Sequence, residues 1–96
     1  MKDIIEIIKF AFDICLKENK ELSYIEFEAL FGSLLRDQYL NENNEKNRED
    51  FIHYFDTHHF YKERYVDYLD KKTGKRPIDL KFEDRGRGMT YYPLYN

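Results

Sequence analysis

One arginine and one histidine, Arg48 and His53, have residue types and a spacing that could support catalysis. A guanidinium stays cationic and can hold a phosphate group, whereas an imidazole titrates near neutral pH and can transfer a proton. Such a pair could cleave RNA by general acid–base catalysis without a metal ion. The structural alternative places Arg48 in the first turn of a surface helix and His53 half-exposed further along it.

The Arg-x4-His spacing of residues 48–53 resembles the motif of HEPN-type ribonucleases, in which both residues face one cleft of a dimer. The resemblance implies an all-helical domain and a metal-independent ribonuclease. It covers six residues, and the C-terminal half of this chain has the composition of β-strands instead. Ribonuclease activity is therefore the last of three functional hypotheses.

Histidines and carboxylates around the same segment could also bind a metal ion. Two ligands on one helix share a face when they are four positions apart. His53 is five and six positions from His58 and His59, so those imidazoles diverge. Asp56 and Glu63 can each face His59, which leaves two pairs and not a complete ligand set. These spacings predict neither a metal site nor a cofactor.

Aromatic and cationic residues of the C-terminal half could bind a protein instead. Most of the nine tyrosines lie there, beside lysines and arginines. Tyrosine combines a large apolar ring with a hydroxyl and loses little side-chain entropy on binding, which enriches it at interfaces. We expect helices to cover one face of a sheet and tyrosines to occupy the other. The residues predicted to contact a partner are Tyr68, Lys71, Lys72, Arg85, Arg87, Tyr91, Tyr92 and Tyr95.

A DNA-binding alternative uses overlapping residues. Residues 23–39, with Gly32 in the turn, could form a helix-turn-helix, and residues 85–88 (Arg-Gly-Arg-Gly) are typical of the wing of a winged-helix protein. Glu28, however, stands where a helix-turn-helix needs a small residue. The cations that would contact backbone phosphates are Lys71, Lys72, Lys75 and Arg76, whereas Glu49, Asp50 and Asp56 would repel them.

Three helices are expected to position these residues. Between Ile4 and Leu16 the polar residues form one narrow stripe, so either this helix is central in the fold or one of its flanks contacts a partner. Ser23 and Glu26 have the spacing of a capping box and begin a second helix that continues to about residue 39. A third helix is expected from Arg48 to about residue 60.

The residue pattern then favours strands. Residues 65–69, 78–83 and 89–95 are β-prone, and turn sequences at 70–75 and 83–88 separate them. Pro93 predicts that the last strand is an edge. The expected fold is α+β, with three N-terminal helices packed on a C-terminal three-stranded antiparallel β-meander, an order that would also suit a winged-helix-like arrangement.

Length and charge limit the classes of protein. We expect a single domain over residues 1–96, with an acidic helical part (1–60) and a basic, Tyr-rich β part (61–96). The first part carries seven Lys and Arg against thirteen Asp and Glu, and the second carries nine against six. A single cysteine, Cys15, is expected in the core and cannot form an internal disulfide. No apolar run is long enough for a membrane span, so we expect a cytoplasmic protein.

These observations favour a small non-catalytic protein-interaction module. Residue types with AT-rich codons number 43 against 14 with GC-rich codons, which suggests an AT-rich genome such as that of a low-GC bacterium, a plasmid or a phage. We therefore expect an anti-defence inhibitor or regulator of a host enzyme, such as a nuclease whose basic groove the acidic helices could occupy. A winged-helix DNA-binding regulator is the first alternative. A homodimer through the Ile4–Leu16 helix is expected separately, and no membrane partner.

Overall fold

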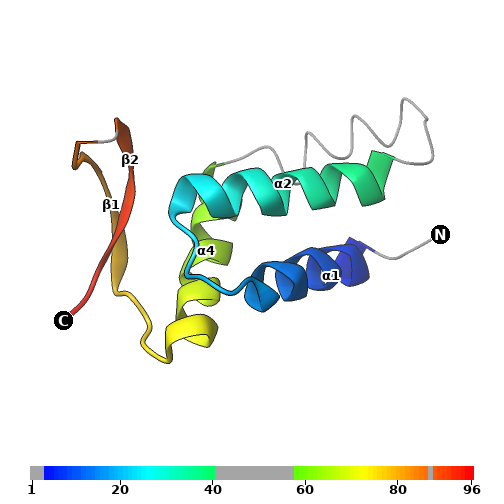
Figure 1. The fold of residues 1–96 in the computed structure, drawn as a ribbon, viewed down its shortest axis with the longest axis horizontal. Coiled ribbons are helices and arrows are strands. Elements are labelled where there is room, and N and C mark those ends of the chain that lie inside the picture. The colour runs from blue at the N-terminus through cyan, green and yellow to red at the C-terminus, as the bar shows by residue number, and fades with distance from the viewer. Residues whose placement is uncertain (1–3, 41–57, 87) are drawn as a thin grey trace.

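The computed structural model describes residues 4–40, 58–86 and 88–96, which form an α+β fold. The helices are α1 (Ile4–Lys17), α2 (Tyr24–Leu40) and α4 (His58–Thr73), and the strands are β1 (Asp79–Asp84) and β2 (Met89–Leu94). In Figure 1, α1 and α2 lie side by side, α4 crosses their ends, and the hairpin occupies the end of the molecule away from the N-terminus. None of the described helices is both long and apolar enough to cross a membrane. The order of helices and strands confirms the coarse prediction of an α+β fold.

The predicted first strand, residues 65–69, is wrong, because α4 continues through this segment to Thr73. Its tyrosines favour strands by propensity, yet Tyr61, Tyr65 and Tyr68 are spaced as one helical stripe and all three are buried. The predicted turn at 70–75 contains the last turn of α4, which ends at Thr73 and is followed by Gly74 with a φ of 78°. The described residues thus form a two-stranded sheet and not a three-stranded meander.

Helix α1 packs through one stripe of small and apolar residues against α2 and α4. Ile7, Ala11 and Cys15 are buried at four-residue intervals, whereas Ile5 and Phe10 are 69% and 39% exposed. Burial raises the pKa of the Cys15 thiol to about 11. The helix is therefore peripheral and not central, and the dimer predicted through it stays a prediction.

Helix α2 begins at the capping box that the sequence predicts. The backbone N–H of Glu26 donates to Ser23 Oγ at 3.2 Å, and the Ser23 N–H donates to Glu26 Oε1 at 3.1 Å. The helix is continuous through Gly32, so the turn that a helix-turn-helix needs at this position is not formed. Gly32 instead permits close packing, because a Cβ there would lie 3.3 Å from the Tyr61 hydroxyl.

Three side chains of α4 hold the connection between α1 and α2. The Leu22 N–H donates to the Tyr68 hydroxyl, and the Tyr65 hydroxyl donates to the Leu22 carbonyl, both at 2.8 Å. Lys72 Nζ donates to the carbonyls of Leu16, at 2.9 Å, and Glu18. The Lys72 bonds satisfy carbonyls at the end of α1, and the tyrosine bonds satisfy both backbone groups of Leu22 just before α2.

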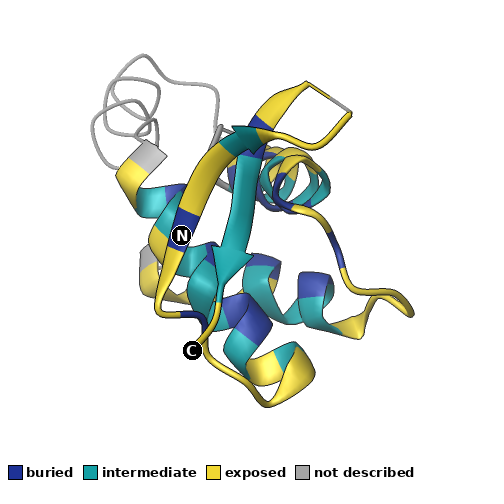
Figure 2. Ribbon diagram, turned by 90° about the vertical axis from the view of Figure 1, so that its left-hand side faces the viewer, coloured by how far each residue is buried: buried dark blue, intermediate teal, exposed yellow. Residues whose placement is uncertain are grey.

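The hairpin is antiparallel, and its pairing runs from Asp79 opposite Leu94 to Asp84 opposite Met89. Positive φ angles at Gly86 (94°) and Gly88 (86°) form the turn. Figure 2 shows that β1 is mostly exposed and β2 mostly half-buried. Among the described residues β2 pairs with β1 alone, so Pro93 lies on an edge strand there, as predicted.

Candidate protein-binding surface on the hairpin

One face of the hairpin packs on the helices near its base and is open near its tip. Cross-strand partners point to the same side of a sheet, so Leu80, Phe82, Met89 and Tyr91 share a face. Leu80 is buried, and the Tyr91 ring lies 4.9 Å from the ring of Tyr24 in the core. Phe82 and Met89, diagonal neighbours beyond the helices, are 53% and 56% exposed. We call Phe82 and Met89 the tip patch.

The opposite face carries an arginine held flat on a tyrosine. The guanidinium of Arg85 lies 4.1 Å from the centre of the Tyr92 ring. Glu83 fixes it there, since its Oε1 accepts from Arg85 Nε at 2.5 Å and its Oε2 lies 3.6 Å from Lys81 Nζ. The hydrogen bond from Arg85 lowers the pKa of Glu83. A cation over an aromatic face is attracted by the ring quadrupole, so the ring of Tyr92 and the carboxylate of Glu83 together favour this position of Arg85.

The remaining predicted contact residues divide between surface and core. Tyr95 is 36% exposed, and Lys75 Nζ lies 4.8 Å from its ring centre. Tyr68 is fully buried, so its prediction as a contact residue is wrong in this fold. Lys71 is exposed, but it lines a cavity between α1 and α4, away from the hairpin. Arg87 lies outside the described residues.

The cations predicted to gather at a hairpin turn are mostly bonded within the chain. They lie at or just beyond the end of α4, because the predicted turn is helical. Arg76 lies 2.9 Å from Asp67 and 3.4 Å from Asp70, and these carboxylates raise its pKa. Lys72 caps α1, and Lys75 lies over a tyrosine. These positive charges are therefore poorly placed to bind a phosphate backbone.

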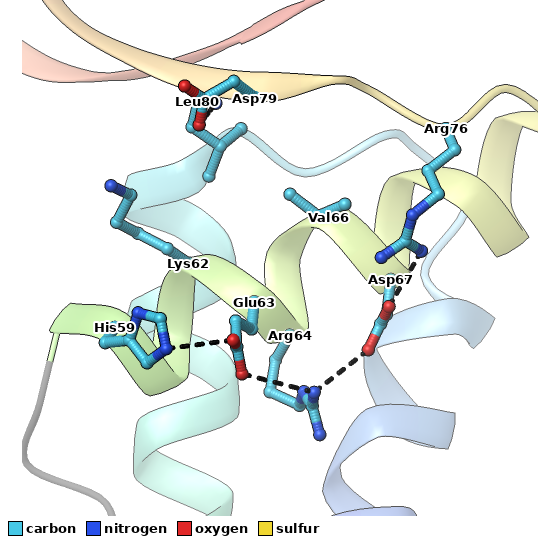
Figure 3. A pocket seen from close by; sticks show the side chains of 9 residues that line it. All are labelled: His59, Lys62, Glu63, Arg64, Val66, Asp67, Arg76, Asp79 and Leu80. Atoms are coloured by element: carbon cyan, nitrogen blue, oxygen red, sulfur yellow. Dashed lines mark hydrogen bonds and ion pairs between the residues drawn. The ribbon is translucent and has the colours of Figure 1, made fainter.

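A cavity of about 380 Å³ between α4 and β1 is lined by charged side chains (Figure 3). His59 lies 2.9 Å from Glu63, and Arg64 bridges Glu63 and Asp67 at 3.9 and 3.2 Å. The carboxylates of Glu63 and Asp67 each face a cation or the imidazole, and Asp79 Oδ1 accepts a hydrogen bond from the Leu80 N–H. Within the described ranges, no three side chains of the metal-binding types are grouped to hold an ion.

Several predicted residues cannot be assessed because they lie outside the described residues. These are Arg48 and His53 of the ribonuclease hypothesis, and Asp56 of the metal hypothesis. The side chain of His58 is not described either. The ribonuclease and metal hypotheses therefore rest on sequence alone.

The sequence analysis missed the tip patch. The alternation of residues 78–83 predicts Phe82 on an apolar face, and we expected helices to cover that face. They cover it only as far as Leu80 and Tyr91. The available signal was position in the sequence, because Phe82 and Met89 stand close to the turn glycines Gly86 and Gly88.

Comparisons of the chain with protein-family models, with curated proteins and with solved structures give no significant match. The geometry of the described residues therefore carries the functional argument.

Proposed function

We propose that this chain is a small, non-catalytic module that binds a protein partner through its β-hairpin. The observation that carries the proposal is the tip patch, where Phe82 and Met89 are more than half exposed side by side. Adjacent apolar side chains exposed to water cost free energy that a partner would recover by covering them.

The surroundings of the tip patch have the composition of an interface. Tyrosine and arginine are enriched among residues that dominate binding energy. Arg85 stacks on Tyr92 on the opposite face of the hairpin. Asp84 lies on the face of the tip patch, and Lys81 and Glu83 lie on the opposite face of the same strand, so charges of both signs border the apolar pair. An apolar centre with a polar rim is the usual arrangement of a protein–protein contact.

We further propose an enzyme as partner, with the chain acting as its inhibitor or regulator in the cytoplasm. A nuclease of a defence system fits because its basic groove would attract acidic side chains. Glu18 and Glu21 are exposed in the connection between α1 and α2 and could contribute to this attraction. The main contact would still be the hairpin, where the exposed apolar surface lies.

The experiment is an affinity pull-down from host lysate with three purified proteins. These are the wild type, a Phe82→Ser/Met89→Ser variant, and an Ile25→Ser control. Ile25 is 53% exposed on α2, so the control removes a similar apolar surface elsewhere. We expect one protein to bind the wild type and the control but not the hairpin variant, and then to bind the purified chain directly.

Equal binding by all three proteins would contradict the proposal. A separate titration tests the winged-helix alternative. That alternative requires duplex DNA binding at low salt, an affinity that falls steeply as salt rises, and a shallower slope in Arg85→Ala.

A further inference from the structure

The outer edge of β1 has backbone groups that its partner strand does not use. Leu80 is paired with Pro93, which has no N–H, so this pair does not exchange hydrogen bonds. In an antiparallel ladder the bonded pairs alternate, so the N–H groups of Leu80, Phe82 and Asp84 point away from β2. The Leu80 N–H donates to Asp79 Oδ1 at 2.8 Å. An edge of this kind is a template for another strand.

The side chains along this edge carry a self-complementary pattern of charge. Asp79, Lys81, Glu83 and Arg85 alternate in sign and, within β1, share by register the face that Leu80 and Phe82 do not occupy; Asp79, at the base of the strand, also lines the cavity between α4 and β1. If a second β1 pairs antiparallel with its centre at Phe82, each Lys81 faces the Glu83 of the other copy. Each Asp79 then faces the other Arg85.

Neighbouring registers are repulsive. A centre at Lys81 would place Lys81 opposite Lys81 and Asp79 opposite Glu83. A centre at Glu83 would place Glu83 opposite Glu83 and Lys81 opposite Arg85. Like charges directly opposite one another destabilise a sheet, so the charge pattern selects the register centred at Phe82.

The arrangement also leaves room for two helical bodies. Antiparallel strands place the helices of the two copies towards opposite ends of the joined sheet, because the helices contact each hairpin from its base as far as Leu80 and Tyr91. At the centre, Phe82, which is 53% exposed, would pack against Phe82 of the second copy. The Leu80 N–H would exchange the Asp79 carboxylate for a backbone carbonyl, which frees that carboxylate for Arg85.

We propose that two copies of this chain associate through the edges of β1 and form a continuous four-stranded sheet in the order β2-β1-β1-β2. This surface differs from the α1 helix through which the sequence predicts a dimer. The proposal does not depend on the partner binding described above, because it concerns purified protein alone.

Sedimentation equilibrium with a charge-swap series tests the register. Lys81→Glu and Glu83→Lys each place like charges opposite one another, and the twofold axis repeats each clash. We expect the dissociation constant of the dimer to rise about tenfold or more in each single variant. The double variant Lys81→Glu/Glu83→Lys restores opposite charges and is expected to return to the wild-type constant. A monomeric wild type at millimolar concentration, or a double variant as weak as the single ones, overturns the proposal.

Disulfide trapping in a Cys15→Ala background gives a second readout. Directly opposed residues of a bonded pair lie about 5.5 Å apart between Cα atoms, within the range a disulfide spans. We expect Phe82→Cys to form a covalent dimer on mild oxidation. Met89→Cys, at a residue of similar exposure on β2, is expected to stay monomeric. Failure of the Phe82 variant to cross-link, or equal cross-linking of both, contradicts the proposed axis.

Discussion

The hydrogen bond from the Leu22 N–H to the Tyr68 hydroxyl should contribute measurably to the stability of the fold. The bond is 2.8 Å long and buried, Leu22 is 5% exposed, and Tyr68 is fully buried. Tyr68→Phe keeps the ring that packs 5.2 Å from Phe27 and removes only the acceptor. The N–H is then left without a partner where water does not reach.

The expected loss follows from the chemistry of that N–H. A buried donor left unsatisfied costs about 1–3 kcal/mol, so Tyr68→Phe should lower the free energy of unfolding by this amount. Tyr65→Phe removes a donor from the Leu22 carbonyl instead. Because unsatisfied carbonyls are tolerated better than unsatisfied N–H groups, its loss should be smaller, about 0.5–1.5 kcal/mol.

Urea denaturation of the wild type and three variants measures these differences. Tyr95→Phe is the control. Tyr95 is 36% exposed, so water can reach the place of the lost hydroxyl and no buried group is left without a hydrogen bond. The midpoint should fall most for Tyr68→Phe, less for Tyr65→Phe and little for Tyr95→Phe, with unchanged slopes. If Tyr68→Phe unfolds at the same urea concentration as Tyr95→Phe, the role assigned to this bond is wrong.

Three further variants test other contacts. Tyr24→Phe should be neutral or stabilising, because the Tyr24 hydroxyl is buried without a hydrogen-bond partner among the described residues. Burial, followed by the nearby Glu28 carboxylate, raises the Tyr24 pKa, so stability should be intact below the unfolded pKa of about 10 and fall as pH rises above it. That fall should be shallower in Tyr24→Phe, as thermal melts between pH 8 and 11 would show. Lys72→Met should lose about 1 kcal/mol in urea denaturation, because it leaves the Leu16 carbonyl without its donor. Hydrogen bonds from Lys20 and then Ser23 lower the Glu26 pKa to about 2, so its contribution is present above the unfolded pKa of about 4.3 and is lost as pH falls towards 2. The difference in melting temperature between wild type and Glu26→Gln should therefore shrink over that range.

Features that depend on a few neighbouring residues were predictable from the sequence. The capping box needs only Ser23 and Glu26 at the right spacing, and both of its bonds are present. The alternation of residues 78–83 specifies a strand, and Pro93 specifies an edge, because each acts through its own backbone geometry.

The first predicted strand failed because the decisive contacts are remote in sequence. Tyr65 and Tyr68 bond to Leu22, 43 and 46 positions away, and these bonds require both residues on one side of a helix. Strand propensity acts locally and does not contain this information. The helical spacing of Tyr61, Tyr65 and Tyr68 was visible, but the β-prone composition of the segment outweighed it in the prediction.

The candidate surface was only partly predictable for a related reason. Which strand positions face the same side follows from the two-residue period, but their exposure depends on how far the helices extend over the sheet. Leu80 and Phe82 are equivalent by pattern, yet one is buried and the other 53% exposed. The pairing of Arg85 with Glu83 likewise depends on the turn conformation set by Gly86 and Gly88.

The two proposals make competing demands on Phe82. In the dimer its ring packs against its own copy, whereas a partner on the tip patch would cover the same ring. Self-association should therefore weaken partner binding as the concentration of the chain rises, and Lys81→Glu, which favours the monomer, should restore it. Phe82→Ser should lose both activities. If Lys81→Glu binds the partner more weakly than the wild type at every concentration, the partner requires the dimer or Lys81 itself, and dimerisation does not compete with partner binding.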